Sequence, residues 1–193
     1  MTNFDKLEKK LGAKFNNIEL LKQALVHRSY LNEHPDSSTG HNERLEFLGD
    51  AVLEIVVTEY LYLNFPDTAE GDLTNWRASL VNSKMLHVIA EELKLEDYLY
   101  LSKGEAKDTG KARQYILANA MEAIIGAIFL DQGYDMAKLF ISQNIFGLID
   151  KIIEDKTWND AKSLFQEKAQ EYYSQTPIYK TVKEEGPDHD KRF

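Results

Sequence analysis

Residues 116–130 (ILANAMEAIIGAIFL) most strongly restrict how this chain can fold. They are apolar on nearly every side of a helix, and Glu122 is the only ionisable residue among the fifteen. A helix that is apolar all round packs in the middle of a protein. A membrane span needs about 20 apolar residues, so this segment is too short to be one. We therefore expect a helical protein built around residues 116–130, with one carboxyl group close to its core.

The remaining sequence also predicts an all-α fold, because apolar residues recur at helical spacing. Further helices are expected over residues 4–11 (ended by Gly12), 18–25, 42–64, 74–93 and 139–153, and polar loops over residues 33–41 and 103–110. The absence of cysteine excludes a disulfide scaffold, a cysteine zinc site and a thiol nucleophile. The charged N-terminus lacks the apolar stretch of a signal peptide, which predicts a cytoplasmic protein without a membrane anchor.

The character of the sequence changes after residue 155. Residues 156–159 are expected to be a linker, followed by a helix over 163–173, a strand over 177–182 and a turn. These few elements cannot bury a core of their own, so residues 160–193 are expected to be the front part of a domain whose remainder is missing. The net charge of −9 belongs to the first 155 residues, because residues 156–193 hold seven acidic and seven basic side chains. This acidity would suit a protein that collects cations.

Three carboxylates share one face of the helix expected over residues 42–64. Glu43, Glu46 and Asp50 are spaced at i, i+3 and i+7, which places them within roughly 60° of one another. The opposite side is expected to supply the packing face, formed by Leu45, Leu48, Val52, Ile55 and Val56. The pattern is compatible with a solvated acidic face or with a group of ligands.

Glu122 favours the second interpretation, because a carboxylate in an apolar helix is costly unless it is paired or bound to a cation. Asn119 lies one turn before it on the same face. If the two helices pack together, the oxygen ligands that converge are those of Glu46, Asp50, Asn119 and Glu122. Such a set suits Mg²⁺, which can activate water and stabilise charge on a phosphate. A structural Glu122 with a satisfied carboxylate remains the alternative.

Several segments resemble the ribonuclease III family. The segment HNERLEFLGDAVL is similar to the family's signature, and GDLTNWRASLVNSKML and ILANAMEAIIGAIFLDQGY are similar to its middle helix and second acidic segment. Residues 160–193 resemble the start of a double-stranded RNA-binding domain. The resemblance implies a helical ribonuclease III endonuclease domain over residues 1–155 and an incomplete α/β RNA-binding domain over residues 160–193.

The resemblance also implies a homodimeric endoribonuclease that cuts double-stranded RNA with Mg²⁺, with Mn²⁺ as a possible substitute and no organic cofactor. Such enzymes act in ribosomal RNA maturation and in the processing of other transcripts. Carried over by motif position, the metal ligands would be Glu46, Asp50, Asn119 and Glu122. Asp50 and Glu122 would be the most critical catalytic residues, with Glu43 as an auxiliary acid. Phe47 would insert its ring into the partner subunit, and Gln166, Glu167 and His189 would contact RNA.

Two departures from the family pattern affect these expectations. Asn119 stands where the family usually has Asp, which predicts a weaker metal affinity because one negative charge is lost. The shortened RNA-binding domain predicts weak, salt-sensitive RNA binding. An alternative is a non-catalytic double-stranded RNA-binding homologue with an impaired metal site, although the retained carboxylates argue against it. A purely structural helical dimer would leave Glu122 unexplained.

Overall fold

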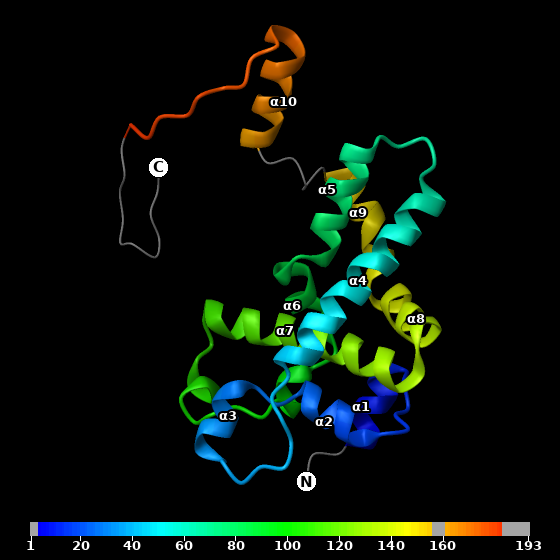
Figure 1. Ribbon diagram of the computed structural model, residues 1–193, viewed down its shortest axis with the longest axis vertical. Coiled ribbons are helices and arrows are strands. Elements are labelled where there is room, and N and C mark those ends of the chain that lie inside the picture. The colour runs from blue at the N-terminus through cyan, green and yellow to red at the C-terminus, as the bar shows by residue number, and fades with distance from the viewer. Residues whose placement is uncertain (1–3, 156–160, 183–193) are drawn as a thin grey trace. The chain divides into compact units, whose positions relative to one another are not determined.

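The computed structural model describes residues 4–155 and 161–182, and the chain divides into two compact units, Met1–Trp158 and Asn159–Phe193. The regular structure of the described residues is helical (Figure 1), as the sequence predicts. The first unit contains α1 (Phe4–Leu11), α2 (Ile18–Ala24), α3 (Arg28–Glu33), α4 (Glu43–Asn64), α5 (Glu70–Val81), α6 (Ser83–Glu92), α7 (Lys111–Gln132), α8 (Tyr134–Ile145) and α9 (Ile149–Asp155). Short 3₁₀ turns lie at Leu95–Tyr98, Glu105–Lys107 and Phe146–Leu148.

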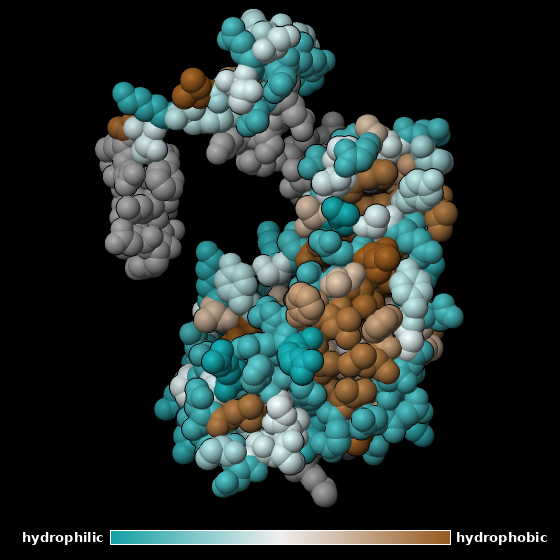
Figure 2. Space-filling model, in the orientation of Figure 1, coloured by the Kyte–Doolittle hydropathy of each residue, from teal (hydrophilic) through white to brown (hydrophobic). Residues whose placement is uncertain are grey.

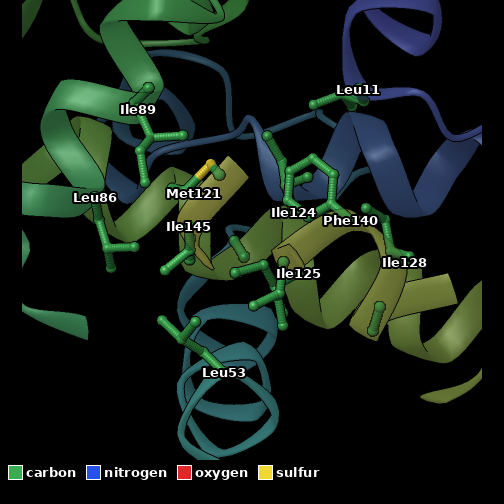
Figure 3. Close-up of a cluster of buried hydrophobic side chains, with 14 of the residues drawn as sticks. Leu11, Leu53, Leu86, Ile89, Met121, Ile124, Ile125, Ile128, Phe140 and Ile145 are labelled. Carbon is green, nitrogen blue, oxygen red and sulfur yellow. The ribbon is translucent and has the colours of Figure 1, made fainter. Parts of the chain in front are cut away.

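Helix α7 is the central element of the first unit, as its composition predicts. It packs against α2, α4, α6 and α8. Figure 3 shows Met121, Ile124, Ile125 and Ile128 of α7 meeting side chains of other helices, which are Leu53, Leu86, Ile89, Phe140 and Ile145. By length and composition α7 could cross a membrane, but 61% of its most apolar window is buried within this protein. Its place in the core accounts for its apolar composition.

Helix α4 crosses α7 and carries the acidic motif (Figure 1). Its buried residues are Leu45, Gly49, Val52, Leu53, Val56, Val57 and Leu61. Ile55 was expected on the packing face, and this prediction is wrong: its side chain is 58% exposed. The reason is that the buried stripe centres on Gly49 and Val56, which leaves Ile55 beyond its edge.

Two predicted helices are each divided into two. The helix expected over residues 74–93 breaks at Asn82, whose extended backbone (φ −73°, ψ 158°) begins a new helix. The Asn82 side chain accepts a hydrogen bond from the backbone N–H of Met85, which caps α6. The helix expected over residues 139–153 breaks at the turn Phe146–Leu148, between α8 and α9. Apolar spacing continues across both breaks, so it does not reveal them.

The second unit contains α10 (Ala161–Tyr173), close to the helix expected over residues 163–173. Ser174 ends α10 in a left-handed conformation (φ 53°). Residues 175–182 have no regular secondary structure, so the strand expected over residues 177–182 is not formed. A strand needs a neighbour for its hydrogen bonds, and no described residue supplies one. The assignment of residues 160–193 to an RNA-binding domain stays a prediction.

Candidate active site at the crossing of two long helices

The backbones of α4 and α7 approach each other closely at two glycines. A Cβ atom on Gly49 would overlap the backbone carbonyl of Glu122, and one on Gly126 would overlap the carbonyl of Leu45. Only glycine allows so close an approach, because any other residue would force the helices apart. The crossing therefore fixes the position of the acidic face of α4 relative to Glu122.

The four predicted ligands, Glu46, Asp50, Asn119 and Glu122, interact at this crossing. The pKa of Glu122 is raised to about 7, mainly by burial and additionally by the negative charges of Asp50 and Glu46. Burial also raises the pKa of Glu46, together with the charges of Glu43 and Asp50, while hydrogen bonding from Asn119 opposes this rise. The structure thus brings together the four residues that the sequence pattern singled out, two from each helix.

The surroundings of Glu46 and Glu122 are strongly acidic. The groups that shift the pKa values of Glu46 and Glu122 are carboxylates and one amide, with no Lys, Arg or His among them. Like charges held together in this way favour protonation or the binding of a cation. Among the described residues, no three His, Cys, Asp or Glu side chains are grouped closely enough to hold a metal ion as they stand. The fit to a divalent metal therefore rests on charge and on the oxygen ligands.

Glu43 lies at the edge of this cluster, in the first turn of α4. Its carboxylate oxygens are 3.6 Å from Arg28 Nη1 and 3.7 Å from His41 Nδ1. The side chain is about half exposed, so both pairs are surface interactions of small energy. Glu43 is close enough to Glu46 to raise its pKa, yet it turns toward basic side chains. This position suits an auxiliary role beside the acidic cluster.

The structure adds an anchored loop at the start of α7 that the sequence pattern does not reveal. The buried Arg113 side chain donates hydrogen bonds from Nη2 to the carbonyl of Glu105 (2.8 Å) and from Nε to the carbonyl of Asp108 (3.1 Å). The Glu33 carboxylate of α3 accepts a hydrogen bond from the backbone N–H of Lys103 (3.2 Å). These hydrogen bonds anchor the loop to the first turn of α7 and to α3. A lone arginine next to a glycine-rich loop gave no signal for this role.

Phe47 is not a core residue, since its side chain is 81% exposed. It lines a groove of about 590 Å³ together with Leu20, Gln23, Glu43, Arg44, Leu45, Leu48 and Leu130. Figure 2 shows an apolar patch over α4 and the C-terminal half of α7, and the exposed apolar residues of these helices include Phe47, Ile55 and Leu130. An exposed apolar patch of this kind indicates an interaction surface.

The predicted RNA contacts belong to the second unit. Gln166 lies on α10 with an exposed side chain. Glu167 is on the same helix, but its side chain lies outside what the structure describes, and His189 lies outside the described residues altogether. These three assignments stay predictions.

Comparisons with known proteins agree on one family. Residues 17–149 match the family model described as Ribonuclease-III-like. The chain is 44% identical over 191 residues to "Ribonuclease 3" of Shewanella baltica, covering 99% of this chain and 81% of the relative. It is also similar to the crystal structure of the nuclease domain of ribonuclease III from Campylobacter jejuni (45% identity, TM-score 0.67), covering 78% of this chain and 96% of that one. A second structure of that domain (45% identity, TM-score 0.66, covering 74% and 98%) is described as flexible in the region involved in dimer formation.

Proposed function

The chain belongs to the ribonuclease III family of endoribonucleases, and we propose that it hydrolyses double-stranded RNA at a divalent-metal site formed by Glu46, Asp50, Asn119 and Glu122. Mg²⁺ is the proposed ion, with Mn²⁺ as a substitute, because hard oxygen ligands suit both. The observation that carries this proposal is the raised pKa of Glu122. A half-buried carboxyl group beside two other carboxylates gains most from a bound cation.

The protein's own groups would prepare this site in separate ways. Glu122 must lose its proton before it can act as a ligand, and its pKa of about 7 permits this near neutral pH. The Asn119 amide hydrogen-bonds to Glu46 and favours the ionised form of that carboxylate. The metal, when bound, would activate water and stabilise negative charge on the scissile phosphate. Asp50 would share the ion with Glu122, and Glu43 would act as an auxiliary acid beside the substrate.

We also propose a homodimer in which each subunit cuts one strand of the duplex. The exposed Phe47 ring and the groove beside Leu48 and Leu130 support it, because the ring of one subunit could enter the groove of the other. Two sites acting on opposite strands would leave short 3′ overhangs and 5′ phosphates. Gln166, Glu167 and His189 are proposed to contact the RNA, and processing of ribosomal and other transcripts in the cytoplasm is the proposed cellular role.

Cleavage of a long, perfect RNA duplex at low salt tests the proposed activity. The reaction is run with Mg²⁺, with Mn²⁺ and with EDTA, using the wild type, Glu122→Gln and the matched control Glu54→Gln, which removes an exposed carboxylate of the same helix as Asp50. Short duplex products are expected with either metal from the wild type and the control, and none with EDTA or Glu122→Gln. An intact duplex that a folded wild type still retards in a gel would indicate a non-catalytic binder.

A further inference from the structure

An exposed tyrosine continues the acidic face of α7. Lys111, Tyr115, Asn119 and Glu122 follow one another at spacings of four, four and three residues, which places all four within about 80° on the helix. The Tyr115 side chain is 51% exposed, whereas Ile116, Leu117 and Ala118 beside it are buried. The phenol makes no hydrogen bond to any described residue. A large aromatic side chain left in solvent on the face of an active site calls for a partner.

We propose that Tyr115 contacts the ribose of the RNA duplex next to the scissile phosphate and recognises its 2′-hydroxyl group. This inference rests on the proposed function and assigns a new substrate contact to the same site. A phenol both donates and accepts a hydrogen bond, as a 2′-hydroxyl does. Tyr115 lies roughly 10 Å along the helix axis from Glu122, since each residue advances about 1.5 Å. Its ring can therefore reach a sugar close to the nucleotide that the carboxylates address.

The surroundings of Tyr115 favour RNA as its partner. Lys111 is exposed and lies one turn before Tyr115 on the same face of α7. The preceding loop holds Lys103 and Lys107 together with the acidic Glu105 and Asp108, so Lys111 is the cation that helix spacing places next to the ring. A lysine at this position suits a phosphate of the RNA backbone, next to the sugar that Tyr115 would contact. The negative cluster at Glu122 would repel a nucleic acid without its metal, and the positive charge of Lys111 would offset part of that repulsion.

The apolar surface proposed for dimerisation lies at the other end of α7. Leu130 follows Tyr115 by fifteen residues, which corresponds to roughly 22 Å along the helix. Phe47 belongs to the groove that Leu130 lines, while Tyr115 is not part of that groove. A second protein subunit is therefore the less favoured partner for Tyr115.

A double-mutant cycle between protein and RNA tests the contact. The substrate is a duplex with one cleavage site, in which 2′-deoxynucleotides replace the nucleotides around that site one at a time. Tyr115→Phe removes only the hydroxyl group, and Tyr62→Phe is the matched control, an exposed tyrosine of α4 placed twelve residues beyond Asp50. We expect Tyr115→Phe to lower kcat/KM about three- to tenfold, the effect of one neutral hydrogen bond. At one position, the deoxy substitution should lower kcat/KM by the same factor for the wild type and for the control. It should change kcat/KM little for Tyr115→Phe, because that variant already lacks the contact.

The outcomes separate this inference from the proposed function. If Tyr115→Phe cleaves as fast as the wild type, Tyr115 makes no productive contact with a 2′-hydroxyl group. The same conclusion follows if Tyr115→Phe lowers kcat/KM by the same factor on the unmodified duplex and on every deoxy-substituted duplex. If the wild type cleaves nothing, the proposed function fails, and the same cycle is scored by the affinity for the intact duplex. If the effects of Tyr115→Phe and of each deoxy substitution on the binding free energy are then additive, the inference is overturned as well. A Tyr115→Ala variant that loses its dimeric mass would assign the ring to the partner subunit instead.

Discussion

At the scale of single residues, the carboxyl group of Glu122 should make the protein's stability depend on pH when no metal is present. Its pKa is about 7 in the folded chain, against an ordinary value of 4.5. The folded state therefore binds more protons than the unfolded state between these values, so the free energy of unfolding falls as pH rises through this window. We expect urea unfolding in EDTA, at constant protein concentration, to show lower stability at pH 8 than at pH 5.

The variant Glu122→Gln should remove most of this pH dependence, because glutamine does not titrate. Glu54→Gln is the matched control and should retain it, since Glu54 is exposed on α4. Saturating Mg²⁺ should stabilise the wild type more at pH 8 than at pH 5, because protons compete with the ion for the same oxygens. A wild type and a Glu122→Gln variant with parallel pH profiles would show that Glu122 is not the group responsible.

Asn119 gives a second prediction at this scale. Asn119→Asp adds a negative charge and removes an amide that lowers the pKa of Glu46. We expect the variant to be less stable than the wild type in EDTA and to need less Mg²⁺ for half-maximal cleavage. Mg²⁺ titrations of the cleavage rate measure this requirement. An unchanged requirement together with an unchanged rate would mean that residue 119 is not a metal ligand.

At the scale of helices, the crossing of α4 and α7 depends on glycine. Gly49→Ala should lower the free energy of unfolding by about 1–3 kcal/mol, because its Cβ would overlap the backbone of Glu122. Gly71→Ala in α5 is the control, since no heavy atom lies within 4 Å of its added Cβ. It should be neutral or stabilise the helix by up to about 1 kcal/mol. Equal effects of the two variants in urea unfolding would contradict the close crossing.

Apolar spacing predicts the existence of helices better than their ends. The segments that became α1, α2, α4 and α7 are evident from it, because each has a clear apolar stripe or a strong stop signal. The breaks at Asn82 and at residues 146–148 are hidden, since apolar residues recur at compatible spacing on both sides. The strand over residues 177–182 was predicted from alternation alone, and alternation does not provide a neighbouring strand.

At the scale of the whole molecule, the exposed Phe47 ring should decide the oligomeric state. Phe47→Glu places a charge in the apolar patch, which should weaken self-association by at least about tenfold. Val88→Glu is the matched control, because Val88 is an exposed apolar residue of α6 outside that groove. Light scattering over a dilution series measures the masses. A Phe47→Glu variant that remains dimeric at every concentration would exclude this surface as the dimer interface.

Only the arrangement of the whole unit determines which carboxylates meet. The sequence identifies Glu43, Glu46 and Asp50 as neighbours on one helix and Glu122 as an isolated buried acid. That Glu122 faces Asp50 depends on the register at which α4 and α7 cross, and the glycine contacts that set this register join residues more than seventy positions apart. The exposure of Phe47 was expected only from family resemblance, because an aromatic residue on an amphipathic helix usually packs inside.

If α4 and α7 together form one divalent-metal site, the protein should bind Mn²⁺, and a calorimetric titration of the metal-free protein tests this most directly. We expect saturable binding of Mn²⁺ to the wild type and to Glu54→Gln. Binding should be at least tenfold weaker in both Asp50→Asn and Glu122→Gln, because each removes one negatively charged ligand from the site. Wild-type affinity in both of these variants, with each shown to be folded, would contradict a metal site at the crossing of α4 and α7.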